Sequence, residues 1–309
     1  MVMLRKASLK YRILSLNNVS LVGGLGIGIA FILSSFLAVY VFSIATIQIF
    51  ALIGVSLVIL VSGVVDDFRE LSVLQKFLVQ LLCAGLLIAF GIRTHIVYIG
   101  FWANAVITLI WILVITNAFN LLDIVDGLAS GIALIVSSAF IVISFLNPDL
   151  NIQILSLALF AANLGFLFFN LPPAKIYLGN SGSHFLGFLI ASIALTSRYA
   201  SLENGFALLS PIVILWLPIV DTLLLIAFRV IKRKTPFRKS NDHIAFRISS
   251  LGFSRVKTLI IMFLLCFIFA GAGTVLTRVN NLCAAAIITA MVLFSVILFW
   301  KLIKIDIHG

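Results

Sequence analysis

The stretch Ala45–Phe68 reads ATIQIFALIGVSLVILVSGVVDDF. Residues 45–64 carry no charged side chain, and about 20 apolar residues are enough for a helix to cross the hydrocarbon core of a bilayer. Two adjacent carboxylates, Asp66 and Asp67, stand just after this run. The stretch therefore predicts a membrane-spanning helix that ends at an acidic pair.

The whole chain has the composition of a membrane protein. Of its 309 residues, 63% are hydrophobic and 10% are charged, and the mean hydropathy is +1.27. A soluble domain of this size carries about 25% charged residues. The three cysteines lie in apolar runs, so their odd count and spacing indicate neither a disulfide framework nor a metal site.

Apolar runs of spanning length recur along the chain. We predict an all-α fold, a polytopic transmembrane helical bundle of about ten spans in a single integral membrane domain, 1–309. A basic N-terminal segment, 1–20, and a basic loop, 229–256, belong to the same domain. The predicted spans are about 21–43, 45–64, 73–92, 96–118, 127–146, 152–170, 184–200, 206–228, 257–277 and 281–300.

The connections between these spans are unequal. With ten spans, the longer polar connections and both termini fall on one side of the membrane, and 18 of the 21 Lys and Arg residues fall there too. Cytoplasmic loops carry an excess of Lys and Arg, so this side is predicted to be cytoplasmic. The net charge of +11 sits in short blocks between apolar runs, which argues against nucleic-acid binding.

Asp66 and Asp67 place two negative charges at a helix C-terminus, which favours cations instead. A divalent cation would relieve their repulsion, because Mg²⁺ binds through one or two carboxylates plus phosphate oxygens. The alternative is a solvated loop start beside Arg69.

A second polar run occupies residues 117–128, reading NAFNLLDIVDGL. Asn117, Asn120 and Asp123 recur every three residues and Asp126 extends the series, so a continued helix would bring them near one face. Alternatively, one of the two aspartates caps the following helix. Capping explains one of the four polar residues, so we favour a functional site.

A third run, residues 170–183, reads NLPPAKIYLGNSGS. Its two prolines stop a helix, and its glycines permit backbone geometries that other residues resist. Ser181 and Ser183 lead into the next span, whose N-terminus could receive a phosphate group. An ordinary connection with a serine cap explains the composition equally well.

Two further features lie nearer the C-terminus. Asp221 stands inside an apolar run, which suggests either a functional carboxylate or one bonded to loop backbone or a base. The loop 229–256 combines a dense basic block with His243 and Arg247. Basic residues there would attract anionic head groups or phosphates.

Taken together and in order, these blocks resemble the polyprenyl-phosphate N-acetylhexosamine-1-phosphate transferases. This family includes the WecA-type enzymes and the MraY translocase of peptidoglycan synthesis. The resemblance covers residues about 20 to 260. It rests on Gly23-Gly24, on Asp66-Asp67 with Lys76 and Gln80, and on the segments 117–128, 170–183, 218–222 and 243–247.

The resemblance implies an activity and its site. Family members use Mg²⁺ to transfer a sugar-1-phosphate from a UDP-sugar to a polyprenyl phosphate, and they release UMP. It implies catalytic roles for Asp66, Asp67 and His243, and metal ligands in Asp66, Asp67 and Asn180. It implies substrate contacts for Lys76, Asn117, Asn120, Asp123, Asp126, Asn170, Tyr177 and Arg247.

The resemblance also implies surroundings and partners. We expect a multi-pass protein of the bacterial inner membrane with its active-site loops on the cytoplasmic face. The expected partners are a UDP-N-acetyl sugar, undecaprenyl phosphate and membrane lipid, with Mg²⁺, or Mn²⁺ in its place, as cofactor. The product would initiate a cell-envelope glycan, and both a monomer and a homodimer are compatible with the sequence.

Three departures from the family pattern keep alternatives open. Asn180 stands where the family has an aspartate that ligates the metal, and Ala245 and Phe246 stand where further histidines are usual. The family also usually has a span before Gly23, where this chain has a basic stretch. A catalytically impaired homologue that binds its substrates without turnover is therefore the main alternative. A transporter is disfavoured, because Asp221 alone fits a midplane site.

Overall fold

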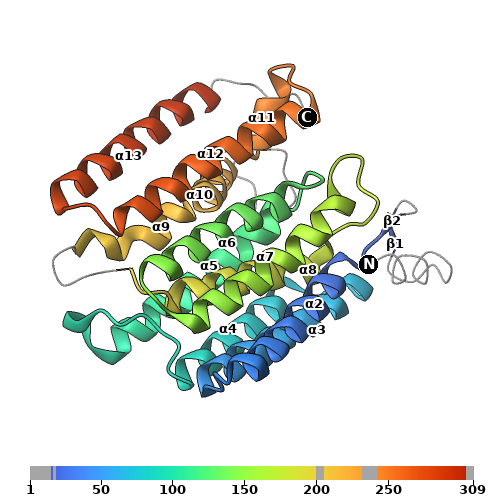
Figure 1. Ribbon diagram of the computed structural model, residues 1–309. Helices are drawn as coiled ribbons and strands as arrows, with labels where there is room; N and C mark the ends of the chain where they lie inside the picture. The colour runs from blue at the N-terminus through green and yellow to red at the C-terminus, as the bar shows by residue number, and fades with distance from the viewer. Residues whose placement is uncertain (1–14, 17–18, 200–204, 232–241, 304–309) are drawn as a thin grey trace. The chain divides into compact units, whose positions relative to one another are not determined.

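The computed structural model describes residues 15–16, 19–199, 205–231 and 242–303 (Figure 1). The chain divides into two compact units, unit 1 (Met1–Ser197) and unit 2 (Arg198–Gly309), and each is described by itself. Most of the predicted basic N-terminal segment and the centre of the loop 229–256 lie outside the described residues. The prediction of a single domain stays a prediction.

Unit 1 consists of helices and one short strand pair. Strands β1 (Ser15–Leu16) and β2 (Val19–Ser20) are antiparallel, and Ser20 forms an isolated parallel bridge with Ile176. The helices are α2 (Gly23–Phe42), α3 (Ile47–Phe68), α4 (Val73–Ala89), the 3-10 helix η1 (Val97–Ile99), α5 (Gly100–Leu122), α6 (Leu128–Leu146), α7 (Leu150–Asn170) and α8 (Gly179–Thr196).

Helix α8 is the centre of unit 1. Of its 18 residues, 15 are buried, and it packs against α2, α3 and α5. Glycines permit the closest approaches: a Cβ at Gly24 would collide with the backbone nitrogen of Gly182, and one at Gly63 would lie 2.5 Å from the Cα of Ser181. Backbone therefore packs directly on backbone at the first turn of α8, which fixes its position.

Side-chain caps explain where α3 and α4 begin. Thr46 accepts a hydrogen bond from the backbone nitrogen of Ile49 at the start of α3. Ser72 and Gln75 form a capping box at the start of α4, in which each side chain accepts a bond from the other's backbone nitrogen. These caps satisfy donors that the first turn of a helix leaves unpaired.

Unit 2 is helical throughout its described part. Its elements are η2 (Gly205–Leu209), α9 (Ser210–Ile214), α10 (Trp216–Ile231), α11 (Ile244–Ser250), α12 (Arg255–Leu276) and α13 (Asn281–Ile303). The run predicted as one span over 206–228 is bent by 66° between Ile214 and Trp216. Pro218 lies in the first turn of α10, where its missing N–H costs no hydrogen bond.

The all-α multi-pass architecture is confirmed, but the count of ten spans is not. In the described residues, seven helices are long and apolar enough to cross a bilayer, or eight if the bent α9–α10 pair counts as one. Helix α4 is apolar but has only 17 residues. Helix α8 is not among the seven, and its first six residues, GNSGSH, include no apolar side chain.

Several helix ends differ from the sequence prediction. Helix α3 continues to Phe68, α5 continues to Leu122, and α8 begins at Gly179 instead of residue 184. Asp66, Asp67 and Asn120 therefore stand in last turns, and Asn180 stands in a first turn. The apolar residues set the length of the membrane-spanning part. The helix continues into polar residues at its ends where their side chains find hydrogen-bond partners.

The packing of α2 on α8 yields a first prediction. Gly24→Ala should lower the melting temperature of the purified protein in detergent by about 5 °C or more, because the new methyl group meets backbone that cannot move aside. The matched control is Gly54→Ala in α3, where a Cβ meets no atom within 4 Å. That change should leave the melting temperature equal or higher, and equal losses in both variants would contradict this packing.

Candidate active site

A cleft of about 630 Å³ opens where α3, α5 and α8 end or begin in unit 1. Carboxylates dominate its lining: Asp66, Asp67, Glu70, Asp123 and Asp126. The other lining residues are Leu21, Phe68, Ile124, Val125, Asn170, Tyr177, Leu178, Gly179 and Asn180. Three sequence blocks that are far apart along the chain thus meet at one acidic surface.

Asp66 is the more deeply buried member of the acidic pair and is 4% exposed. One carboxylate oxygen lies 2.7 Å from the Nζ of Lys76, and the other accepts a hydrogen bond of 2.8 Å from the backbone nitrogen of Leu71. The end of α3 is therefore tied to the start of α4. This ion pair neutralises one of the two adjacent charges and leaves the other to a different partner.

That partner is the N-terminus of α8. Asp67 accepts hydrogen bonds from the backbone nitrogens of Asn180, at 2.7 Å, and Ser181, at 3.0 Å. Gly179 has a φ of +75°, and a Cβ there would lie 2.8 Å from the Asp67 carboxylate. The glycine is needed both for the left-handed turn and for the close approach. The positive end of the α8 dipole stabilises a carboxylate that the end of α3 disfavours.

Helix α5 contributes two asparagines through different contacts. The Asn120 amide donates hydrogen bonds to the Oδ1 of Asn180, at 3.1 Å, and to the Oγ of Ser183, at 3.0 Å. The Asn117 amide donates to the Oε1 of Gln80 and to a backbone carbonyl one turn earlier, both at 2.7 Å. Asn120 therefore orients the cleft residue Asn180, whereas Asn117 joins α5 to α4 without lining the cleft.

Asn170 links the loops on the far wall of the cleft. Its Oδ1 accepts bonds from the backbone nitrogen of Gly127, at 3.0 Å, and from the Oγ of Ser130, at 2.8 Å. Its Nδ2 donates to the carbonyl of Ile176 at 3.0 Å. The side chain is buried and all its bonds are internal. In unit 1 it holds two loops in place, which is a structural role.

The loop from 171 to 178 is held at both ends. Asp126 accepts a bond of 3.1 Å from the backbone nitrogen of Ala174. Tyr177 donates its backbone N–H to Ser20 at 2.8 Å and accepts from Gly23 at 3.1 Å. These bonds place Tyr177 on the cleft wall beside the start of α2.

Asp123 differs from the other carboxylates. It follows the last residue of α5 and is half-buried, and within the described chain no group donates a hydrogen bond to its side chain. Burial, together with the nearby carboxylates of Asp67 and Asp126, raises the pKa of Asp123 from its ordinary 3.8 to about 7, and burial is the largest cause. A neighbouring cation would therefore stabilise the ionised form of Asp123 more than that of the other cleft carboxylates.

The oxygen-rich lining fits a hard divalent cation in its chemistry. The charge of Asp66 is already paired with that of Lys76. The carboxylates that could bind a cation are therefore Asp67, Asp123 and Asp126. Among the described residues, no three Asp, Glu, His or Cys side chains converge closely enough to hold a metal. Substrate phosphate oxygens would complete the ligand set, as is usual for Mg²⁺.

The predicted residues of unit 2 contact one another within that unit. Asp221 is fully buried, and its carboxylate lies 2.7 Å from the Nδ1 of His243 and accepts a bond of 2.7 Å from the backbone nitrogen of Ile244. The sequence left open whether Asp221 is a functional carboxylate or one bonded to loop backbone or a base. The contacts match the second alternative. Asp221 therefore ties α10 to the start of α11.

Arg247 is also enclosed within unit 2 and is 2% exposed. Its guanidinium donates to the carbonyl of Leu302, at 2.9 Å, and to the carboxylate of Asp242, at 3.0 Å, and it stacks 3.8 Å over the ring of Phe228. These contacts join α10, α11 and α13. They identify a structural role, and the substrate role of Arg247 stays a prediction.

The structure thus brings together much of the predicted site. Seven predicted residues line the cleft: Asp66, Asp67, Asp123, Asp126, Asn170, Tyr177 and Asn180. Lys76 and Asn120 reach it through Asp66 and Asn180, while Asn117 does not line it. His243 and Arg247 belong to unit 2. The catalytic, metal-binding and substrate-binding roles themselves stay predictions.

Sequence reasoning missed two residues. Glu70 lines the cleft beside the acidic pair. His184 is 5% exposed and lines a small second pocket with Asp66, Lys76 and Gln80. The signal was its spacing: His184 lies four residues after Asn180, which is one turn along a helix that begins at Gly179. A span predicted to begin at residue 184 hid this relation.

Comparison with known proteins gives consistent matches. The model of glycosyl transferase family 4 matches residues 49–198. A Bacillus subtilis protein named "Probable undecaprenyl-phosphate N-acetylglucosaminyl 1-phosphate transferase" is 34% identical over 254 residues, which cover 80% of this chain and 69% of that protein. The phospho-N-acetylmuramoyl-pentapeptide-transferase of Staphylococcus epidermidis is 30% identical over 264 residues, which cover 76% and 78%.

A more distant match has a related name. The decaprenyl-phosphate N-acetylglucosaminephosphotransferase of Mycobacterium leprae is 28% identical over 263 residues, which cover 74% of this chain and 66% of that protein. All three matches extend well beyond a single motif. The chain spans between two thirds and about four fifths of the length of these relatives.

The raised pKa of Asp123 predicts a pH-dependent stability. The folded state holds this proton more tightly than the unfolded state, so the contribution of Asp123 to stability is largest near pH 4 and is lost as the pH rises through about 7. Asp123→Asn should therefore raise the melting temperature by about 3 °C or more at pH 8 in a chelator, and by progressively less toward pH 4.5.

The matched control is Glu70→Gln, which removes an exposed carboxylate from the same cleft. It should produce little change at either pH, because an exposed charge remains solvated. If Asp123→Asn gave the same shift at pH 4.5 as at pH 8, the raised pKa would be wrong.

Proposed function

Because the chain belongs to glycosyl transferase family 4, we propose that it transfers an N-acetylhexosamine-1-phosphate from a UDP-sugar to a polyprenyl phosphate and releases UMP. One observation supports this most. The acidic pair, the 117–128 run and the 170–183 loop meet in one cleft at the end of helices that enter a bilayer. A membrane lipid and a water-soluble nucleotide could reach each other there.

The proposed reaction is a phosphoryl transfer. An oxygen of the lipid phosphate attacks the β-phosphorus of the UDP-sugar and forms a new P–O bond. The bond from that phosphorus to the bridging oxygen breaks, and UMP leaves with the electron pair. Such reactions need positioning and screening of charge more than covalent help from the protein.

The cleft residues would share this work. The Asp67 cap holds the first turn of α8, and Asn120 holds the side chain of Asn180, so the wall facing the phosphates is fixed before substrate binds. Lys76 on α4 neutralises Asp66 at the end of α3, which lowers the repulsion that the phosphates would meet there. Mg²⁺, or Mn²⁺ in its place, would bind Asp67, Asp126 and phosphate oxygens and would supply the positive charge that brings two polyanions together.

Asp123 is suited to take up a proton during this reaction. A general base works best when its pKa lies near the working pH, and the pKa of Asp123 is about 7. The lipid phosphate must lose its remaining proton to attack as the stronger nucleophile. This adds a proton-accepting role to the nucleotide contact that the sequence resemblance implied for Asp123.

The setting follows from the same proposal. The protein is a multi-pass membrane protein, and we place it in the bacterial inner membrane with the acidic cleft on the cytoplasmic face, where the positively charged loops are predicted. Undecaprenyl phosphate is the proposed lipid, as in the name of the Bacillus subtilis relative. The product would be the first lipid-linked intermediate of a cell-envelope glycan.

One observation favours the alternative of a homologue that binds its substrates without turnover. Asn180 has no charge, and its side-chain oxygen already accepts a hydrogen bond from Asn120. A neutral, occupied oxygen is a weaker ligand for a hard cation than a carboxylate. Both the transferase and the non-catalytic homologue are expected to bind the nucleotide, but only the transferase is expected to turn it over.

An assay for UMP release tests the proposed transfer. The purified protein, given undecaprenyl phosphate, Mg²⁺ and UDP-N-acetylglucosamine or UDP-N-acetylgalactosamine, should release UMP. Asp67→Asn should lower the rate at least about 100-fold, because a charge beside the phosphates is lost. Its melting temperature should fall less than that of Asp67→Ala, since the single oxygen of asparagine can still accept one of the two N–H bonds that cap α8.

Asp67→Ala separates the two roles of this carboxylate. It removes both the charge and the cap, so it should lose activity and also melt at a lower temperature. UMP release by Asp67→Asn at the parent rate would refute the proposed role. Nucleotide binding without UMP release from any UDP-sugar tested would favour the non-catalytic homologue.

Asn180→Asp tests the metal-binding corner. The change keeps the oxygen that accepts from Asn120 and adds charge at a helix N-terminus, so the fold should tolerate it. We expect the Mg²⁺ concentration for half-maximal UMP release to fall about tenfold, or the rate to rise. Asn280→Asp, at the start of α13 in unit 2, adds the same charge to a capping residue elsewhere and should change neither. An unchanged Mg²⁺ requirement in Asn180→Asp would contradict the ligand role.

A further inference from the structure

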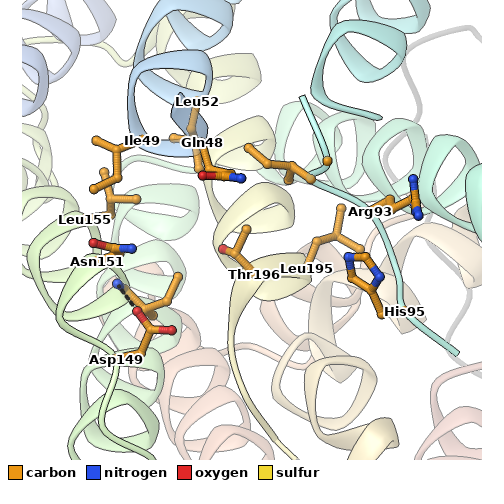
Figure 2. Close-up of a pocket in the computed structure, with 13 residues that line it drawn as sticks. Gln48, Ile49, Leu52, Arg93, His95, Asp149, Asn151, Leu155, Leu195 and Thr196 are labelled. Atoms are coloured by element: carbon orange, nitrogen blue, oxygen red, sulfur yellow. Dashed lines mark hydrogen bonds between the residues drawn. The ribbon is translucent and has the colours of Figure 1, made fainter. Parts of the chain in front are cut away.

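A second cavity of about 220 Å³ lies at the other end of the unit 1 helices (Figure 2). Its lining includes Gln48, in the first turn of α3, whereas the acidic cleft includes Asp66, in the last turn. Eighteen residues of helix separate these two positions, or about 27 Å at 1.5 Å per residue. The hydrocarbon core of a bilayer is about 30 Å thick, so the two sites lie at opposite head-group layers.

The surroundings of the cavity also match a membrane interface. Tyr98 is 97% exposed and Trp102 is 80% exposed, and both lie just after the segment that forms one wall. Tyrosine and tryptophan collect where lipid head groups meet the hydrocarbon core. The cavity therefore faces the layer that holds phosphate and amine groups of lipids.

The wall that carries Arg93 and His95 is built rigidly. Thr94 donates its backbone N–H to the Oγ1 of Thr108 at 2.9 Å and its hydroxyl to the carbonyl of Asn104 at 2.9 Å. The Asn104 side chain also exchanges two bonds of 2.9 Å with the backbone of Ile96. Residues 94 and 96 are thus bonded to α5, and the alternate positions 93 and 95 line the cavity.

Opposite charges stand on opposite sides of this cavity. The Arg93 guanidinium stacks 4.5 Å over the ring of Phe101, and no carboxylate among the described residues lies within ion-pairing distance of it. Figure 2 shows Arg93 and His95 on one side, and Asp149 and Asn151 on the other. Asp149 caps α7 by accepting a bond of 3.3 Å from the backbone nitrogen of Ile152.

We propose that this cavity binds the head group of a zwitterionic phospholipid, with its phosphate at Arg93 and His95 and its ammonium group at Asp149. A zwitterion brings a group of opposite charge to each of the two walls, which a simple anion or a simple cation does not do. The amide and hydroxyl groups of Gln48, Asn151 and Thr196 supply further hydrogen-bond partners. The aromatic residues at this level favour a lipid over a free amino-alcohol phosphate.

Native mass spectrometry of the full chain in detergent tests this site. The parent would be titrated with phosphatidylethanolamine, with phosphatidylglycerol, which has the phosphate but no ammonium group, and with glycerophosphoethanolamine, the head group alone. We expect phosphatidylethanolamine to bind most tightly. Arg93→Gln should weaken both lipids about tenfold, because it removes a charged partner of the phosphate.

Asp149→Asn should weaken phosphatidylethanolamine about threefold or more and should not weaken phosphatidylglycerol. Asparagine is as good a helix cap as aspartate, so α7 should keep its start. Arg255→Gln, an exposed arginine at the start of α12, is the matched control and should change neither affinity.

Three outcomes would overturn the proposal. One is an unchanged phosphatidylethanolamine affinity in Arg93→Gln. Another is an equal loss for both lipids in Asp149→Asn, which would remove the ammonium assignment. The third is binding of glycerophosphoethanolamine as tight as binding of the lipid, which would make the ligand a soluble molecule.

Discussion

The contact between the Asp67 carboxylate and the first turn of α8 sets the arrangement of the acidic cleft. A carboxylate at the end of α3 is disfavoured by that helix and would be costly near a bilayer, yet two backbone N–H groups of α8 receive it. Gly179 makes the approach possible, and Gly24 and Gly63 let α2 and α3 lie against the same turn. One end of unit 1 is therefore organised around the start of a single buried helix.

The position of the first turn of α8 determines the other contacts of the cleft. With α8 fixed, the side chain of Asn180 accepts a hydrogen bond from Asn120 on α5. Asp123, which directly follows α5, lines the cleft. The other member of the acidic pair, Asp66, pairs with Lys76 on α4. Among the described residues, the side chain of Asp123 is partly buried beside like charges and accepts no hydrogen bond, which is why its pKa rises and why a cation would be drawn to this side of the cleft.

Apolar runs and charge bias were enough to predict an all-α membrane bundle and the order of its helices. The polar helix ends could not be predicted, because they depend on partners distant in sequence: α8 begins at Gly179 since Asp67, 112 residues earlier, caps it. Asp66, Asp67, Asp123 and Asp126 could be assigned to one site because their motifs are compact. The internal hydrogen bonds of Asn170 and Arg247 could not be predicted, since the sequence does not show which loops a buried polar side chain joins.

The most direct test follows the β-phosphate of the nucleotide sugar. The protein would be incubated with undecaprenyl phosphate, Mg²⁺ and UDP-N-acetyl sugar labelled with ³²P at the β-phosphorus, and the lipid would then be extracted. Transfer of a sugar-1-phosphate predicts that the label moves into the lipid fraction while unlabelled UMP is released. Label that remained with the nucleotide as UDP, while sugar moved to the lipid, would contradict the account, as would label that stayed in unchanged UDP-sugar.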